Sequence, residues 1–277
     1  MTQKSILITG ASSGIGYYCA HELHKTGYQV IASCRKQDDV DRLRSEGLTA
    51  VQIDVADSTS IQQGVVEVLK LTEGKIYALF NNGAYGQPGA VEDLTRTILR
   101  QQFETNFFGW CEITNLLLPI MLQQGEGRII QNSSVLGFAA MPMRGAYNAS
   151  KYAIEGISDT LRLELAGTGV FVSLIEPGPI ESNFRKNALA ALETNINIAQ
   201  SRHQQSYNAA IDRLSKVTSS TPFTLGPDAV YKRLVHALEA KHPQARYYVT
   251  FPTYFAGVMK RLLPTALLDK LLKKMGS

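Results

Sequence analysis

The chain has 277 residues, which is enough for one large domain or two small ones. Hydrophobic residues make up 44% and charged residues 19%, with 22 glycines and 10 prolines, and this usage excludes collagen-like, fibrous and disordered chains. The net charge is only +4, and the excess of basic residues lies at the C-terminal end, where seven basic residues and one acidic residue follow position 240. The rest of the chain is near neutral, which predicts no nucleic-acid partner.

Short apolar runs alternate with longer stretches of helical periodicity. The runs are rich in β-branched residues, which is typical of strands covered by helices on both faces. The pattern therefore predicts an α/β fold: a single doubly wound parallel sheet of the Rossmann type with helices on both faces. We predict strands at Ser5–Thr9, Gln29–Ser33, Thr49–Ile53, Ile76–Phe80, Arg128–Asn132 and Val170–Ile175, and helices near 14–26, 38–46, 58–72, 93–124 and 146–167.

The alternation stops after the sixth strand. Residues 176–225 show only weak periodicity, and a loop of this length is typically a binding lid or disordered, so we predict a substrate lid. A helix from Gly226 to about Ala240 and a strand near Arg246–Thr250 follow. Without a repeat or a second boundary, residues 1–277 form one domain, with a core at 1–175, the lid at 176–225 and a C-terminal helical extension at 226–277.

The tail at 251–275 mixes leucines and phenylalanines with lysines and can form amphipathic helices. Pro252, Pro264 and the charges interrupt it, so it cannot span a membrane. We favour a tail that packs over the substrate pocket or a partner subunit, and peripheral contact with an anionic membrane is the alternative. The apolar stripes on the predicted helices also suit a subunit interface, so a homodimer or a homotetramer is an open alternative to a monomer.

The cysteines are Cys19, Cys34 and Cys111. Their odd number and wide spacing fit neither a disulfide framework nor a metal site, so we expect no bound metal. The N-terminal apolar stretch is too short for a secretory signal. Both observations predict a cytoplasmic protein.

A glycine-rich segment, residues 9–16, links the first strand to the first helix. Its glycines permit a tight turn and close approach of backbone N–H groups to a pyrophosphate, and the helix N-terminus adds a positive partial charge. We therefore expect a dinucleotide to bind at Gly10, Ser12, Ser13, Gly14, Ile15 and Gly16.

Tyr147 and Lys151 lie four positions apart on a predicted helix, so they share one face. A free tyrosine has a pKa of about 10, and a neighbouring ammonium favours the phenolate. We therefore predict that Lys151 lowers the pKa of Tyr147 and makes it a general acid/base.

The G-x-x-x-G-x-G spacing, the Tyr-x-x-x-Lys pair and a serine, Ser134, thirteen residues before Tyr147 together resemble the short-chain dehydrogenase/reductase family. The matches run in order from residue 5 to about 182. Within the family, the sequence is most similar in character to bacterial NADP-dependent aldehyde reductases. The similar stretches are Ser33–Val40, Phe107–Gly109, Glu126–Ile130, Ser173–Ile180 and Lys260–Pro264.

The resemblance implies catalytic roles. Ser134 and Tyr147 would hold the carbonyl oxygen, and Lys151 would also bind the nicotinamide ribose hydroxyls. Asn106 would bend its helix and hold a water that links the lysine to solvent.

The resemblance also implies further cofactor contacts. Asp54 would accept from the adenine amino group with Val55 beside it, although Asp54 reads equally as a helix N-cap that Asp57 or Ser58 can also supply. Asn82 stands in a segment similar to the family's N-N-A-G with the last two residues exchanged. The segment that would wrap the nicotinamide amide contains Pro177, Gly178, Ile180 and Ser182, the last in place of the usual threonine.

The end of the second strand reads Ser33-Cys34-Arg35-Lys36, without a carboxylate for a ribose 2′-hydroxyl. The Arg35 guanidinium can bind a 2′-phosphate with two hydrogen bonds, and Lys36 adds a point charge. We therefore predict NADP(H) as the cofactor.

Residues 135–143 and the lid around Phe184 are mostly apolar and rich in methionine, which favours a small hydrophobic aldehyde or ketone as substrate. NADPH would deliver hydride to the carbonyl carbon while Tyr147 supplies the proton. The alternatives are an NADP(H)-sensing regulatory or binding protein with the same fold, and a ketoacyl-carrier-protein reductase.

Overall fold

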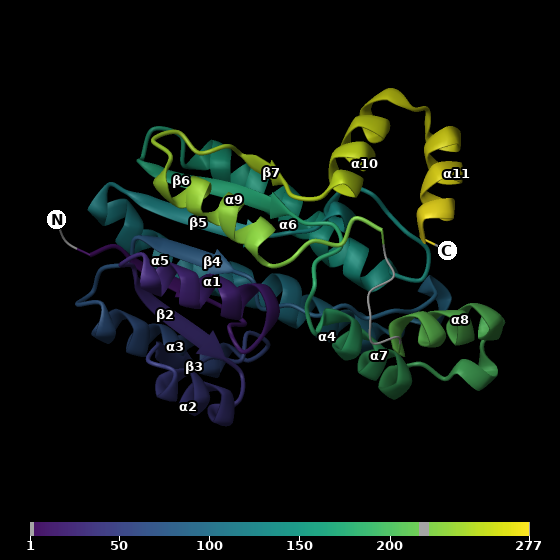
Figure 1. Cartoon of the computed structure of the whole chain (residues 1–277), viewed down its shortest axis with the longest axis horizontal. Coiled ribbons are helices and arrows are strands. Elements are labelled where there is room, and N and C mark those ends of the chain that lie inside the picture. Colours follow the sequence, from purple (N-terminus) through teal and green to yellow (C-terminus); the bar gives the residue numbers. More distant parts are fainter. Residues whose placement is uncertain (1–2, 216–221, 277) are drawn as a thin grey trace.

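A parallel sheet of seven strands forms the centre of the computed structural model, which describes residues 3–215 and 222–276 (Figure 1). The strand order is β3-β2-β1-β4-β5-β6-β7, and every pairing is parallel. The predicted Rossmann-type sheet is confirmed, and each predicted strand lies within two residues of an observed one. The strands are β1 (Ser5–Ile8), β2 (Gln29–Cys34), β3 (Thr49–Gln52), β4 (Ala78–Asn81), β5 (Gly127–Asn132), β6 (Val170–Glu176) and β7 (Arg246–Tyr248).

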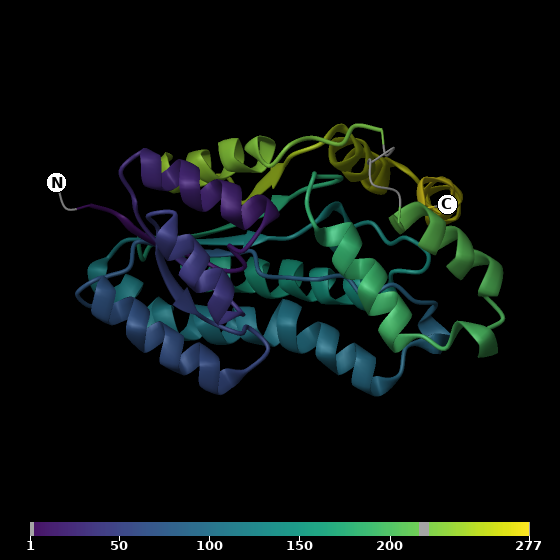
Figure 2. The same ribbon diagram turned by 60° about the horizontal axis from the view of Figure 1, so that its bottom comes forward.

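Helices cover both faces of the sheet. Successive strand residues point to opposite faces, so Ile6 and Ile8 join one core while Leu7 joins the other. Figure 2 shows α1 and α9 on one side of the sheet and the blue and teal helices on the other. The first layer contains α1 (Gly14–Lys25), α2 (Gln37–Ser45) and α9 (Asp228–Glu239), and the second contains α3 (Ser58–Leu71), α5 (Gly109–Gln124) and α6 (Gly145–Glu164).

The strand order reverses between β1 and β4. From β1 the chain adds β2 and β3 on one side, then returns to place β4 on the other. Ligands of open α/β sheets bind at this switch point, outside the carboxyl ends of the strands. The loops after β1, β4 and β5 therefore converge at one edge of the sheet.

The helix predicted over 93–124 is interrupted. A short turn, η1 (Val91–Asp93), precedes α4 (Arg96–Phe103), and a π-helical segment, η2 (Glu104–Phe108), then leads into α5. Apolar periodicity alone does not show such a segment, because one extra residue per turn changes the spacing only locally.

The loop expected at 176–225 is instead helical over most of its length, and its role as a substrate lid stays a prediction. The segment contains α7 (Phe184–Asn195), the short turn η4 (Ile198–Gln200) and α8 (Gln204–Ser215), while its residues 216–221 lie outside the described part. Each helix buries only two side chains, Ala188 and Leu192 on α7 and Tyr207 and Ala210 on α8, so the apolar stripe is too narrow to show as clear periodicity.

Two helices end the chain, α10 (Phe251–Leu262) and α11 (Thr265–Gly276), and both lie beyond the carboxyl ends of the strands (Figure 1). Ala256 and Leu272 from these helices pack against η3 (Val135–Gly137), the turn that follows β5. The Lys260 Nζ donates to the carbonyl of Phe138 at 2.6 Å. Among the described helices, none has the length and hydropathy that a membrane span requires.

Candidate active site

The glycine loop after β1 leaves no room for side chains. Gly10 has φ +66°, and a Cβ there would lie 2.5 Å from the Cα of Gly83. A Cβ at Gly16 would lie 2.4 Å from the Gly10 carbonyl oxygen. The first turn of α1 has no side-chain cap and no acidic residue. A helix N-terminus of this kind presents free N–H groups and fits a pyrophosphate.

Thr9 and Asn82 hold the glycine loop in place. The Thr9 hydroxyl accepts from the backbone N–H groups of Asn82 and Gly83, both at 2.9 Å. The Asn82 amide nitrogen donates to the carbonyls of Thr9 (3.0 Å) and Gly10 (3.2 Å). Asn82 therefore braces the loop that would contact the cofactor. Thr9, which sequence reasoning missed, does the same.

Lys151 is buried at the end of β5. Its Nζ donates to the Asn132 carbonyl at 2.8 Å, and the Asn132 side chain donates to the Asn82 Oδ1 at 2.8 Å. The ammonium also lies 4.2 Å from the centre of the Trp110 ring, whose Nε1 donates to the carbonyl of Gly83. Burial lowers the pKa of Lys151 to about 7, against the opposing charge of Glu155.

Ser134 and Tyr147 come together where β5 ends and α6 begins. The Ser134 Oγ accepts from the Leu136 N–H at 3.1 Å, and the serine side chain lies close enough to the Tyr147 phenol to lower its pKa. Burial raises the pKa of Tyr147 to about 12, while the Ser134 hydrogen bond and the Arg144 charge lower it. The tyrosine is therefore protonated at neutral pH.

The predicted effect of Lys151 on this tyrosine is corrected by the structure. Lys151 is not among the groups that lower the pKa of Tyr147, and its Nζ lies 5.7 Å from the centre of the tyrosine ring. Burial removes much of the lysine's charge near neutrality, and its hydrogen bond goes to Asn132 instead. Spacing on a helix face predicts proximity but not protonation.

Asn106 lies fully buried in the π-helical segment. Its Nδ2 donates to the Tyr85 carbonyl (2.9 Å) and the Ser150 hydroxyl (3.1 Å), and its Oδ1 accepts from the Tyr85 N–H (3.1 Å). These bonds satisfy the amide inside the protein. The expected distortion of the helix is present, and the water-holding role stays a prediction.

Asp54 is not the N-cap of α3. Asp57 takes that position, since its carboxylate accepts from the Ser60 N–H at 2.7 Å. The Asp54 carboxylate accepts from the N–H of Ala56, two residues on. Val55 follows with its carbonyl oxygen against Gly109, where a Cβ would lie 1.8 Å away. The adenine contacts expected of Asp54 and Val55 stay predictions.

The end of β2 lies beside the glycine loop, because the Ala11 N–H donates to the Ser33 carbonyl at 2.9 Å. Arg35 and Lys36 follow as exposed cations. A third cation, Arg42 of α2, donates to the carbonyl of Ser12 at 2.7 Å and was not predicted from the sequence. Its carboxylate partners are Asp39 and Glu46.

The segment after β6 connects the site to the glycine loop. The Pro177 carbonyl accepts from Val135 N–H at 2.8 Å, and Gly178 lies so close to Thr250 that a Cβ would be 2.1 Å from its Oγ1. Ile180 pairs with Leu225. Ser182 faces the glycine loop, since a Cβ at Gly14 would lie 2.9 Å from the Ser182 Cβ.

Apolar side chains surround the Tyr147 ring. The Phe184 ring lies 5.3 Å away between ring centres, at the start of α7. Tyr147 packs against a small buried cluster around η3, and Phe138, Met141 and Leu268 of α11 pack against the same cluster. The tail therefore shares this apolar cluster with the tyrosine.

A buried group of charges, missed by sequence reasoning, lies behind the site. Glu176, fully buried at the end of β6, and Glu155 of α6 both contact Arg246 of β7, at 3.1 and 3.0 Å. Ser133 donates to Glu155 at 2.5 Å. Burial and the neighbouring Glu155 charge raise the pKa of Glu176. The group ties the ends of β5 and β6 to the start of β7 around α6.

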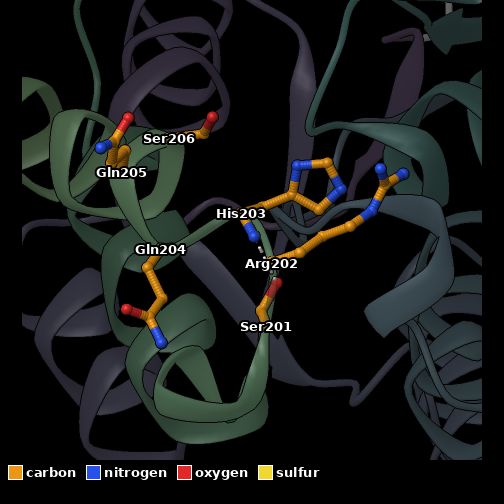
Figure 3. A pocket seen from close by; sticks show the side chains of 6 residues that line it. All are labelled: Ser201, Arg202, His203, Gln204, Gln205 and Ser206. Carbon is orange, nitrogen blue, oxygen red and sulfur yellow. Dashed lines mark hydrogen bonds between the residues drawn. The ribbon is translucent and has the colours of Figure 1, made fainter.

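A polar surface hollow lies elsewhere, between η4 and α8, and is lined by residues 201–206 (Figure 3). Arg202 and His203 side chains lie close together there, and both pair with Glu92, at 2.6 and 3.1 Å. These contacts anchor α8 to η1. The hollow contains none of the predicted site residues.

Known proteins resemble this chain along its length. A family model described as short chain dehydrogenase matches residues 4–193. The chain is 45% identical over 271 residues to the uncharacterized oxidoreductase YbbO of Escherichia coli, which covers 98% of this chain and 94% of that protein. It is 34% identical over 276 residues to a probable short-chain type dehydrogenase/reductase, VdlC of Helicobacter pylori, covering 96% of each. A 3-ketodihydrosphingosine reductase of Bacteroides thetaiotaomicron is 36% identical over 188 residues, 68% of each chain.

Solved structures share the fold. A short chain dehydrogenase/reductase from Burkholderia phymatum, in complex with NAD, is 27% identical with a TM-score of 0.78 and covers 98% of this chain and 95% of that one. An actinorhodin polyketide ketoreductase with NADPH is 26% identical with a TM-score of 0.72, covering 89% and 95%. One neighbour thus holds NAD and the other NADPH.

Proposed function

The chain belongs to the short-chain dehydrogenase/reductase family as an oxidoreductase, and we propose from that premise that it uses NADP(H) to reduce a hydrophobic aldehyde or ketone reversibly to the alcohol. The observation that carries the proposal is the placement of the Ser134 hydroxyl beside the Tyr147 phenol, at the same sheet edge as the glycine loop. Two hydroxyls placed in this way can both reach one carbonyl oxygen.

Tyr147 is the proposed proton donor. Its raised pKa, about 12, keeps the hydroxyl protonated at neutral pH, and this is the form that reduction requires. Ser134 would donate to the same oxygen as negative charge builds there. Lys151, fixed by Asn132, would hold the ribose of the cofactor, which supplies the hydride when bound.

The choice of NADP(H) rests on the end of β2. Arg35 and Lys36 are exposed beside the glycine loop, and no carboxylate stands before Asp38. Among the described residues, the Arg35 guanidinium has no partner, so it is available to a 2′-phosphate. The residues therefore fit NADP(H) better than NAD(H).

The substrate class follows from the apolar side chains around Tyr147, which Phe184, Phe138 and Met141 contribute. Such surroundings favour a hydrophobic carbonyl compound over a sugar. One relative is named for the reduction of 3-ketodihydrosphingosine. A ketoacyl-carrier-protein reductase is the second candidate, favoured by the similarity to a polyketide ketoreductase.

Purified protein tests the proposal directly. We expect it to consume NADPH in the presence of medium-chain or aromatic aldehydes, and NADH at least about tenfold more slowly. A carrier-bound ketoacyl thioester in the same assay separates the second candidate. A protein that binds NADPH tightly but turns over no carbonyl compound would instead be the nucleotide-sensing alternative.

A further inference from the structure

Three arginines gather beside the catalytic tyrosine. Arg144 lies in the turn before α6, three residues ahead of Tyr147. Arg185 is in the first turn of α7, next to Phe184, whose ring contacts Tyr147. Arg213 lies near the end of α8, and its carbonyl accepts from the Arg185 Nη2.

These cations repel one another. Burial is the main cause that lowers the pKa of Arg144, and the charge of Arg213 lowers it further. Burial and then the charge of Arg185 likewise lower the pKa of Arg213. Arg144 precedes Tyr147 by three residues at the start of α6, and its charge lowers the pKa of the phenol. Like charges held together at half-buried positions are costly unless an anion neutralises them.

The protein supplies no such anion among the residues that the structure describes. No carboxylate contributes to the electrostatic environment of Arg144 or Arg213. The Arg144 Nη1 donates to the sulfur of Met141 at 3.0 Å, and a thioether is a weak acceptor. The Arg185 Nη1 is buried without a hydrogen-bond partner.

A structural role explains only one of these contacts. Arginine near a helix C-terminus stabilises the last carbonyls, and the Arg185 Nη2 does this for α8. That contact leaves the Arg185 Nη1 and the Arg144 guanidinium unexplained. Both are suited to bind a planar anion.

We propose that Arg144, Arg185 and Arg213 form a binding site for a carboxylate carried by the substrate. This inference rests on the proposed function, and it narrows the substrate to a hydrophobic aldehyde or ketone with a carboxylate at its far end. The apolar cluster of Tyr147, Phe138 and Met141 receives the chain, and the arginines hold the charged end. One substrate thereby matches both features of the site.

A pair of substrates tests the proposal: a medium-chain ω-oxo carboxylate and its methyl ester, compared with NADPH at saturation. A charge-assisted hydrogen bond predicts a kcat/KM about tenfold to a hundredfold higher for the acid, mostly through KM. The preference should weaken as ionic strength rises. Equal kcat/KM for acid and ester would overturn the proposal.

Variants assign the preference to the arginines. Arg213→Gln should raise KM for the acid by about tenfold and leave the ester unchanged, and Arg144→Gln should reduce the ratio of acid to ester in the same way. Lys186→Gln is the matched control, because Lys186 is an exposed cation on the same turn as Arg185. A ratio unchanged in Arg213→Gln, or lowered equally by Lys186→Gln, would contradict the site.

A binding measurement separates this proposal from the reaction itself. If neither acid nor ester is reduced, the proposed function fails, and calorimetry with a medium-chain fatty acid and NADP⁺ still tests the arginines. We expect saturable binding of the fatty acid, at least about tenfold weaker in Arg213→Gln and weak for the corresponding alcohol. Equal binding of acid and alcohol would overturn the site.

Discussion

The Lys151 Nζ donates to the main-chain carbonyl of Asn132 at 2.8 Å, so the ammonium is held at the end of β5. Asn132 in turn donates to Asn82, which braces the glycine loop through Gly10. One chain of hydrogen bonds therefore joins helix α6 to the glycine loop.

The pH dependence of catalysis should follow this lysine. Its pKa, lowered to about 7, means that the ammonium is present below neutrality and is lost as pH rises through about 7. Tyr147, with a pKa of about 12, stays protonated over the same range. We expect kcat/KM for NADPH to be level at acidic pH and to fall above neutrality by up to about tenfold per pH unit.

The Lys151→Met variant is the control for that profile, because it has no ammonium to lose. Its rate should be low throughout and show no decline near neutrality. A wild-type profile that stays level up to a pH of roughly 9 would show that the charge of Lys151 has no part in the rate.

The Thr9→Val substitution should weaken both the fold and cofactor binding. It leaves the N–H groups of Asn82 and Gly83 without their acceptor, and an unsatisfied buried donor costs about 1–3 kcal/mol. Chemical denaturation measures the loss of stability, and NADPH fluorescence measures the loss of affinity. Thr9→Ser keeps the hydroxyl and should match the wild type in stability and in NADPH affinity. A Thr9→Val variant with the same stability and affinity as Thr9→Ser would refute the bracing role.

The Arg35→Asp substitution should reverse the cofactor preference. It replaces the guanidinium that would donate hydrogen bonds to the 2′-phosphate with a carboxylate that accepts from a ribose hydroxyl. We therefore expect kcat/KM for NADPH to fall about tenfold to a hundredfold and kcat/KM for NADH to rise. Lys36→Asp should have a smaller effect, because a point charge lacks the bidentate geometry. Steady-state kinetics with both nucleotides decides the matter: an Arg35→Asp enzyme that still prefers NADPH would exclude this role.

The sheet was predictable because its strands are buried on both faces. Runs such as residues 6–8 and 78–80 are apolar without interruption, and this composition is typical of a strand between two helix layers. The position of the glycine loop was also predictable from the sequence, because Gly10 and Gly16 allow close backbone contacts that a side chain would prevent. The positions of Tyr147 and Lys151 followed from helical spacing.

Other parts of the site depend on partners distant in sequence. The pKa of Lys151 is set by burial among Trp110, Asn132 and their neighbours, which spacing on its own helix does not reveal. The group of arginines comes from three separate elements, so no local motif marks it. Helices α7 and α8 were missed because each buries one narrow stripe against a small satellite core.

The Tyr147→Phe variant, assayed for NADPH-dependent reduction of a hydrophobic aldehyde, tests the central claim most directly. General acid catalysis predicts a fall in kcat of about 10²–10⁴-fold with NADPH affinity kept within about twofold. A variant that keeps most of its activity would show that a group other than the Tyr147 hydroxyl delivers the proton.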